Sequence, residues 1–173
     1  MKNSPYSNMK QILLICAVVM LVGCGTTSWV SDPSDEDNVL IEKAIRKELK
    51  KPTGELTKAD LGKVTDLNLY LPKNTDAGLK ELAKCKQLKE LRLTAQITDA
   101  GLKEVAKLQK LERLDLDETE ITDSGLKEVA KLQQLTWLGL AVTQITDAGL
   151  KEVAKLQKLK TLNLFRTQIT KAS

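Results

Sequence analysis

Residues 97–108 read ITDAGLKEVAKL, and closely similar stretches occur at 74–85, 121–132 and 145–156. The four copies are spaced by 23, 24 and 24 residues, measured between their glycines, Gly78, Gly101, Gly125 and Gly149. Self-similarity at this period indicates a protein built from small supersecondary units. We therefore expect the copies to stack in a row, each one contacting mainly its neighbours.

Each unit has two halves that differ in periodicity. The first half has the pattern Leu-x-x-Leu-x-Leu, and its last two leucines, such as Leu114 and Leu116, alternate as they do in a strand. In the second half Leu102 and Val105 fall at helical spacing, and Thr98 precedes them with a side-chain oxygen that can cap a helix. One unit cannot bury its apolar face alone, so the pattern predicts a parallel sheet covered on one side by helices.

Over residues 64–173 the pattern resembles the leucine-rich repeats with an Ile-Thr-Asp-x-Gly-Leu core that are common in bacteria, a type related to the cysteine-containing subclass. The resemblance implies an α/β fold, a right-handed horseshoe arc with strands on the concave side and helices on the convex side. The expected units are 64–87, 88–110, 111–134, 135–158 and a partial unit at 159–173. Cys85 occupies a leucine column, and we expect it to be a small buried hydrophobe.

Before the repeats, residues 38–63 resemble the N-terminal cap of the internalins. The amphipathic stretch 39–50 predicts a helix, and Lys51-Pro52-Thr53-Gly54 ends it. Residues 56–61 then repeat the start of the Ile-Thr-Asp-Ala-Gly-Leu half without room for a longer helix. The cap is expected to shield the first repeat from water.

The N-terminus has the features of an export signal. Residues 1–10 are polar with two lysines, and residues 11–23 are almost entirely apolar but shorter than the roughly 20 residues of a membrane-spanning helix. The run ends in Leu21-Val22-Gly23-Cys24, which resembles the bacterial lipobox. The resemblance implies a signal peptide over 1–23 and acyl chains, such as palmitate, on Cys24.

A lipid on Cys24 would anchor the protein to a bacterial membrane. Cys24 is followed by Gly25 and not by the aspartate that retains many lipoproteins in the inner membrane. The expected location is therefore the outer membrane, facing the periplasm or the surface. Residues 24–37 are polar and contain a proline, and we expect them to form a flexible tether.

The composition argues against catalysis and against nucleic-acid binding. The sequence contains no histidine, and it has no nucleophile elbow, phosphate-binding loop or zinc-ligand spacing. The net charge is +4, and it falls to +2 once Lys2 and Lys10 leave with the signal peptide, which is too small a bias for a nucleic-acid partner. We expect a non-enzymatic protein with neither cofactor nor metal ion.

In this repeat the third, fifth and seventh residues point out of the sheet, and the eighth lies on its rim. The aromatic residues of the repeats all fall in these positions, and aromatic and arginine side chains are those that anchor interfaces. The alternative is that they cover the sheet or contact the tether. The candidate ligand-binding residues are Tyr70, Arg92, Arg113, Asp115, Asp117, Trp137, Asn163, Phe165 and Arg166.

Charged residues also follow the repeat. The carboxylates of residues 115–120 are expected to form a solvated acidic patch, relieved by Arg92 and Arg113, because strand spacing does not converge them on a calcium ion. On the helices, lysine columns containing Lys103 and Lys107 flank a glutamate column, which predicts Lys–Glu pairs between layers. An alternative role for the lysines is contact with anionic envelope polymers or lipid head groups.

The sequence thus predicts a lipid-anchored protein that recognises a protein or a glycan at the bacterial cell envelope. The alternative is a structural or self-assembling envelope spacer without a specific ligand. This alternative rests on the last predicted strand, after which no C-terminal cap is recognisable in the sequence. An uncapped edge of this kind would favour self-association.

Overall fold

The computed structural model of the chain describes residues 28–29, 36–71, 76, 78–95 and 97–170. The expected signal peptide and Cys24 lie outside these residues. Among the helices in the described part, none has both the length and the apolar character needed to cross a membrane. The elements in chain order are β1 (Ser28–Trp29), α2 (Glu36–Glu48), β2 (Leu56–Thr57), α3 (Lys58–Leu61), β3 (Asp66–Leu71), α4 (Leu79–Leu82), β4 (Glu90–Ala95), α5 (Asp99–Val105), β5 (Arg113–Asp115), α6 (Asp123–Val129), β6 (Trp137–Gly139), α7 (Asp147–Val153) and β7 (Thr161–Asn163).

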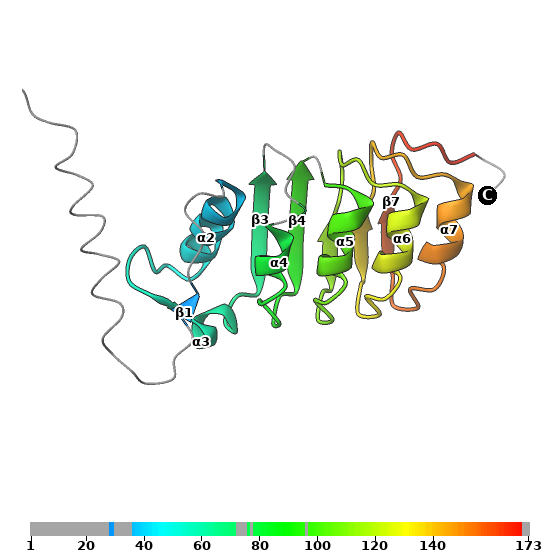
Figure 1. Ribbon diagram of the computed structural model, residues 1–173. Coiled ribbons are helices and arrows are strands. Elements are labelled where there is room, and N and C mark those ends of the chain that lie inside the picture. Colours follow the sequence, from blue (N-terminus) through cyan, green and yellow to red (C-terminus); the bar gives the residue numbers. More distant parts are fainter. Residues whose placement is uncertain (1–27, 30–35, 72–75, 77, 96, 171–173) are drawn as a thin grey trace, which may run out of the picture.

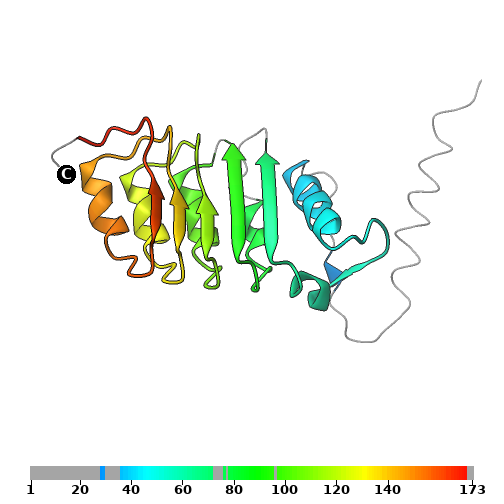
Figure 2. The same ribbon diagram turned by 180° about the vertical axis from the view of Figure 1, so that it is seen from behind.

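The repeats form two layers. Strands β3 to β7 lie side by side in chain order as one parallel five-stranded sheet, and helices α4 to α7 cover one of its faces (Figures 1 and 2). This arrangement confirms the α/β solenoid that the two alternating periodicities predict. Among the described residues, no helix covers the opposite face of the sheet, and we call this the outer sheet face.

The strand register aligns the repeats position by position. Glu90 pairs with Arg113, Arg113 with Trp137, and Trp137 with Thr161. The fifth positions align in the same way, as Arg92, Asp115, Gly139 and Asn163. These are the columns read from the sequence, so side chains that are about 24 residues apart in the chain become neighbours on the outer sheet face.

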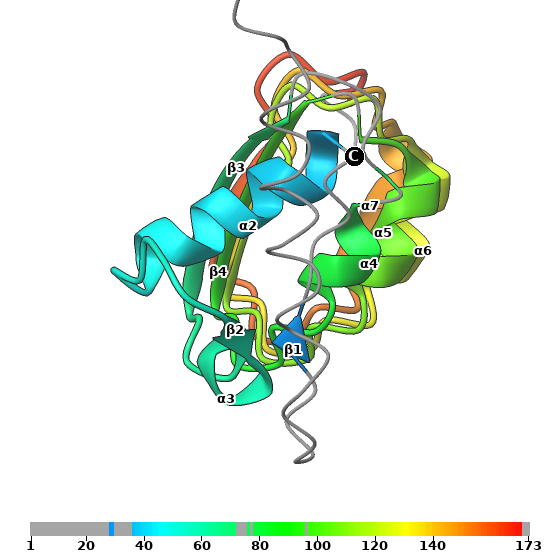
Figure 3. The same cartoon turned by 60° about the vertical axis from the view of Figure 1, so that its left-hand side comes forward.

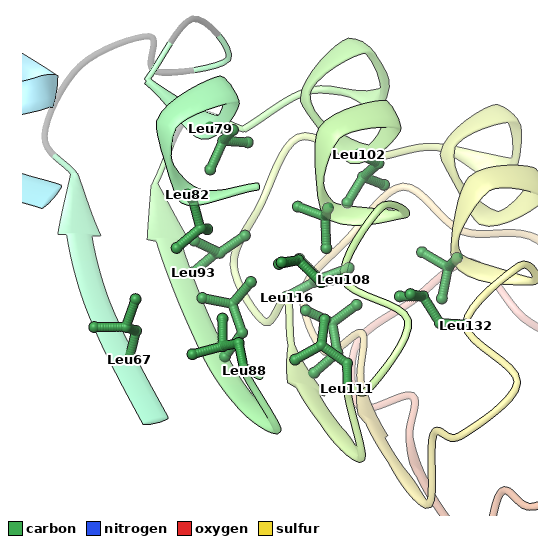
Figure 4. Close-up of a cluster of buried hydrophobic side chains, with 14 of the residues drawn as sticks. Leu67, Leu79, Leu82, Leu88, Leu93, Leu102, Leu108, Leu111, Leu116 and Leu132 are labelled. Carbon is green, nitrogen blue, oxygen red and sulfur yellow. The ribbon is translucent and has the colours of Figure 1, made fainter. Parts of the chain in front are cut away.

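The core is a stack of aliphatic layers between the sheet and the helices (Figure 4). The leucines of the inner repeats are almost fully buried, for example Leu88, Leu111 and Leu135 just before β4, β5 and β6, each at 0 % exposure. In the last repeat Leu162 and Leu164 are only partly buried. Cys85 is buried among them as its column predicts, and burial raises the pKa of its thiol to about 11. The thiol therefore stays protonated at neutral pH and packs as a hydrophobe.

The threonine and the aspartate that recur in each copy have separate roles. Thr98 is the N-cap of α5, and its hydroxyl oxygen accepts a hydrogen bond from the amide of Ala100. The Asp99 carboxylate instead accepts hydrogen bonds from the amide and the hydroxyl of Thr122 in the following repeat. The same bond pair recurs along the solenoid, and we call the series the Asp–Thr ladder: Asp76 to Thr98, Asp99 to Thr122, Asp123 to Thr146 and Asp147 to Thr170.

The ladder explains the glycine that defines the repeat. At Gly125 an added Cβ would overlap Oδ1 of Asp99 and would lie 2.7 Å from Cδ1 of Leu102. Gly101 and Gly149 are hemmed in by the corresponding aspartate and leucine of their preceding repeats. Glycine at this position therefore lets one helix approach the next closely enough for the aspartate to reach its threonine.

The N-terminal cap covers the first repeat. Helix α2 lies across the end of the two layers and packs against β3 and α4 (Figure 3). It buries Ile41 and Ile45 completely, and it spans Glu36–Glu48 where the sequence predicts 39–50. The helix begins earlier than predicted because the acidic residues before Val39 already belong to it, and it ends before Lys50.

The predicted tether over 24–37 needs a correction at two places. Residues Ser28–Trp29 form strand β1, which pairs antiparallel with β2 of the cap, Ser28 opposite Thr57 and Trp29 opposite Leu56. Residues 36–37 belong to helix α2. Backbone pairing with the cap, which a polar composition does not reveal, therefore fixes part of this segment.

Candidate functional site

The centre of the outer sheet face is a stacked pair, Arg113 and Trp137. The guanidinium carbon of Arg113 lies 3.5 Å from the centroid of the Trp137 ring, in cation–π geometry. Both residues are half-buried. The far end of the indole lies against Gly139, where a Cβ would come within 2.7 Å of Cη2 of Trp137. The ring is thus held between a cation on the preceding strand and bare backbone on its own strand.

Asp115 is the predicted site residue whose environment differs most from expectation. It is only 7 % exposed, and its Oδ2 accepts a 2.8 Å hydrogen bond from Nε of Arg92. Its Oδ1 accepts a hydrogen bond from the amide of Asp117. Asp115, which the sequence predicts as an outward-facing ligand-binding group, is therefore buried: both of its carboxylate oxygens accept hydrogen bonds and its neighbours cover it. It holds Arg92 in place.

Asp117 joins two strands that are not adjacent. Its Oδ1 accepts a 2.7 Å hydrogen bond from the amide of Ala141, and its Oδ2 accepts a 3.0 Å bond from Nδ2 of Asn163 on β7. This contact passes over Gly139, whose missing side chain leaves room for it. Burial raises the pKa of Asp117 and the charges of Asp115 and Glu118 add to the shift, while the hydrogen bonds from Ala141 and Asn163 oppose it.

The carboxylates of residues 115–120 therefore divide into two groups. Asp115 and Asp117 are bonded within the sheet, whereas Glu118 and Glu120 are exposed. The acidic patch predicted from the sequence is thus limited to its last two members. In the part of the chain that the structure describes, no three His, Cys, Asp or Glu side chains are grouped so as to hold a metal ion.

At the C-terminal end of the sheet, Phe165 is 64 % exposed, and the Arg166 guanidinium carbon lies 5.2 Å from its ring centroid. Val142, which is not among the predicted site residues, is also exposed. Tyr70 pairs with Thr94 through its backbone, and the side chain of Tyr70 lies outside the described structure. Apart from Tyr70, the predicted residues lie in two contact groups. One is the stacked pair Arg113 and Trp137 beside Gly139. The other is a hydrogen-bonded row that runs along the sheet and ends with the Arg166 guanidinium over the Phe165 ring: Arg92, Asp115, Asp117, Asn163 and Phe165.

The depression found on the described part of the outer sheet face is small for a small-molecule site. A depression between the first three strands, lined by Asp66, Asn68, Glu90, Arg92 and Arg113 together with two leucines, has a volume of about 150 Å³. Sites that enclose small molecules typically have roughly 300–1,000 Å³. A shallow, mixed-charge surface of this kind suits a macromolecular partner better.

The helix face differs from expectation in how its charges pair. Lys107 binds Glu104 at 2.6 Å within one repeat, and Lys131–Glu128 and Lys155–Glu152 repeat the contact. The pairs predicted between layers are therefore wrong. A separation of three residues on a helical turn brings the two side chains together more readily than stacking does.

The sequence of one repeat matches a known family. Residues 107–130, which contain β5 and α6, match a family model described as "Leucine Rich repeat". The fold is a leucine-rich-repeat solenoid. Proteins built from such repeats are typically non-enzymatic and generally mediate protein–protein recognition. A search of curated proteins gave no match.

Several solved leucine-rich-repeat structures resemble the chain. Internalin C2 from Listeria monocytogenes has 19 % identity and a TM-score of 0.43, over 79 % of this chain and 90 % of that one. The internalin inlF of the same bacterium has 19 % identity and a TM-score of 0.38, over 82 % and 60 %. The ectodomain of the receptor kinase SOBIR1 from Arabidopsis thaliana has 14 % identity and a TM-score of 0.38, over 82 % and 99 %.

Proposed function

We propose that this leucine-rich-repeat chain binds a partner protein through its outer sheet face, at a surface centred on Arg113 and Trp137. The observation that supports this function is the stacked pair itself. Tryptophan and arginine are the residue types that most often dominate binding energy, and a side chain held in place before binding loses little entropy on association. Arg113, Trp137 and Gly139 supply such a preformed anchor.

The same geometry favours a protein over a glycan. A sugar ring binds an indole by lying flat on it, and the guanidinium of Arg113 already covers one face of Trp137. The surrounding groups carry both charges, with Glu90 beside Arg113 in the register and Arg92 bound to Asp115. A mixed pattern of this kind suits the charged and polar groups of a protein surface.

We also propose that recognition takes place at the bacterial outer membrane or cell surface, with a lipid on Cys24 as the anchor. The support is the lipobox-like sequence at 21–24 after an apolar run. Strand β1 is paired with the cap, so only residues 24–27 separate the anchor from the folded part. Four extended residues reach about 14 Å, which would keep the capped end near the head groups.

The binding proposal is tested by comparing full-length variants for capture of envelope proteins. Trp137→Ala and Arg113→Ala should each lose a protein that the unchanged chain retains, and the purified protein should bind at least roughly tenfold more weakly to them. Lys127→Ala, on the opposite layer, is the matched control and should bind normally. Retention by both site variants would contradict the proposal, as would binding of purified envelope polysaccharide alone.

The anchor is tested separately by growing cells with an alkyne-bearing fatty acid. The unchanged chain should become labelled and should fractionate with membranes, and Cys24→Ser should do neither. Cys85→Ser is the control and should remain labelled, since Cys85 is buried. An unlabelled wild-type chain would exclude the lipid anchor but would leave the binding proposal standing.

A further inference from the structure

The rim of the sheet repeats an unusual backbone conformation. Glu118, Val142 and Arg166 occupy the same position in successive repeats and have φ values of 60°, 56° and 55°. The amides of Glu118 and Val142 each donate a 2.8 Å hydrogen bond to the next repeat, to the carbonyls of Ala141 and Phe165. The left-handed conformation is therefore part of the repeat and holds these three residues in a regular column.

Val142 is the least suitable residue for that conformation. A branched Cβ collides with the backbone in the left-handed region, where glycine and asparagine are the usual occupants. The side chain of Val142 is 45 % exposed, so little burial in the core compensates for the strain. A strained residue whose side chain faces solvent indicates a role outside the folded monomer.

Val142 has one exposed apolar neighbour, Phe165. Three large hydrophobic residues are exposed in the described part of the chain, and Val142 and Phe165 are two of them. The hydrogen bond from the Val142 amide to the Phe165 carbonyl fixes their backbones next to each other. Exposed apolar side chains that are adjacent on a surface typically mark an interaction site.

The charged residues on either side of Val142 indicate what kind of surface would fit against it. Glu118 precedes Val142 in the column and Arg166 follows it, and neighbouring strands are about 4.8 Å apart. Both charged residues are exposed, and neither takes part in the ion pairs of the described residues, while the Arg166 guanidinium lies near the Phe165 ring. The column thus carries a negative group, an apolar group and a positive group at even spacing.

A pattern of this kind is complementary to itself. If a second copy is turned by 180° about an axis through Val142, its Arg166 faces Glu118, its Glu118 faces Arg166, and the two Val142 side chains meet. Such mutual contact of one patch with itself defines the interface of a two-fold dimer. We propose that the chain forms a symmetric homodimer through this rim column, with Phe165 extending the apolar contact.

This interface goes beyond the proposed recognition function and leaves its surface free. The stacked pair lies at the start of β5 and β6, whereas Glu118 and Val142 follow the ends of those strands. A dimer would therefore display two copies of the outer sheet face. The two proposals are also separable by experiment, because their residues do not overlap.

Charge reversal tests the dimer. The full chain in a neutral detergent is examined by sedimentation velocity at several concentrations, and we expect a dimer whose fraction grows with concentration. Glu118→Arg alone and Arg166→Glu alone should each weaken dimerisation at least roughly tenfold, because like charges then face each other. An equimolar mixture of the two variants should restore the dimer, and so should the double variant, since both recreate opposite charges.

Lys127→Glu on the helix layer is the matched control and should dimerise like the unchanged chain. Circular dichroism of each variant verifies that it is folded. Three results would each overturn the proposal: a wild-type chain that is monomeric at every concentration, a dimer that neither single reversal weakens, or a mixture that fails to restore what the single variants lost.

Discussion

The Asp99 carboxylate receives a 2.8 Å hydrogen bond from the Thr122 amide and a 2.6 Å bond from the Thr122 hydroxyl. These bonds join residues that are 23 positions apart in the chain. Thr122 is also the N-cap residue of α6. A carboxylate with a backbone donor and a hydroxyl donor makes charge-assisted bonds, which are among the stronger contacts in proteins. The ladder therefore couples each helix start to the repeat before it.

Asp99→Ala should destabilise the fold by about 1–3 kcal/mol, because the partly buried amide of Thr122 loses its acceptor. Urea unfolding of the full chain measures the change. Asp147→Ala is the matched control, since the equivalent bonds that Thr170 donates to Asp147 are exposed and water can replace them. Equal decreases in the free energy of unfolding for the two variants would show that the partial burial of the Asp99–Thr122 bonds adds nothing to stability.

The contact between Arg113 and Trp137 should be measurable as a coupling energy. A double-mutant cycle with Arg113→Ala and Trp137→Ala should give about 0.5–1 kcal/mol, the range for a partly exposed cation–π pair. Unfolding in urea supplies the four stabilities. Additive effects would show that the indole is not held by the guanidinium, and the preformed anchor would lose its basis.

The cap should respond to acid through Asp60. The Lys51 side chain lowers the pKa of Asp60 below its ordinary value of 3.8, and hydrogen bonds from the amide and hydroxyl of Thr57 add to this effect. A carboxyl group whose pKa is lower in the folded than in the unfolded state stabilises the fold at pH values above the pKa of the unfolded state. That contribution is lost as the pH falls below about 3.8 toward the folded pKa.

Asp60→Asn should accordingly be less stable than the unchanged chain at neutral pH, and the difference should narrow as the pH falls through the acid range. Urea midpoints at neutral pH and at about pH 3 provide the comparison. Glu55→Gln, an exposed residue in the same cap, serves as the control and should show no such narrowing. A difference that stays constant with pH would argue against the Asp60 ion pair.

Val142→Asn should raise the stability of the monomer by about 1 kcal/mol, because asparagine accepts a φ of 56° more readily than valine does. The same substitution should weaken the dimer by removing the central apolar contact. Unfolding is measured at a concentration low enough to suppress dimerisation. Gln144→Asn, at an exposed position nearby on the same loop, should change neither property. A less stable Val142→Asn monomer would contradict the strain argument.

The regular parts of the molecule could be predicted because they repeat locally. Alternating leucines such as Leu114 and Leu116 identify the strands, and apolar residues at helical spacing identify the helix layer. Because the repeats have nearly equal length, equivalent residues of successive strands align in columns. The outward position of Trp137 beside Arg113 follows from those columns. Their direct stacking does not, since it depends on the rotamers that the bare backbone of Gly139 permits.

What the sequence could not reveal are contacts between units or between unlike segments. Asp99 looks like a helix-start residue, and only the stacking of repeats turns it toward Thr122. Asp115 is on an outward column yet buried, because Arg92 folds over it from the preceding strand. The pairing of β1 with β2 joins segments with no shared pattern. The sequence signal for the ladder is the glycine two residues after the aspartate in each of the four copies.

In the Asp–Thr ladder a carboxylate encoded in one unit always completes the following unit, and never its own. An internal unit can therefore be duplicated or lost as a whole while each remaining threonine still meets an aspartate, as long as the cut falls at the same point of the period. The chain can thus change length, and with it the extent of its outer sheet face, without passing through an unfolded ancestor.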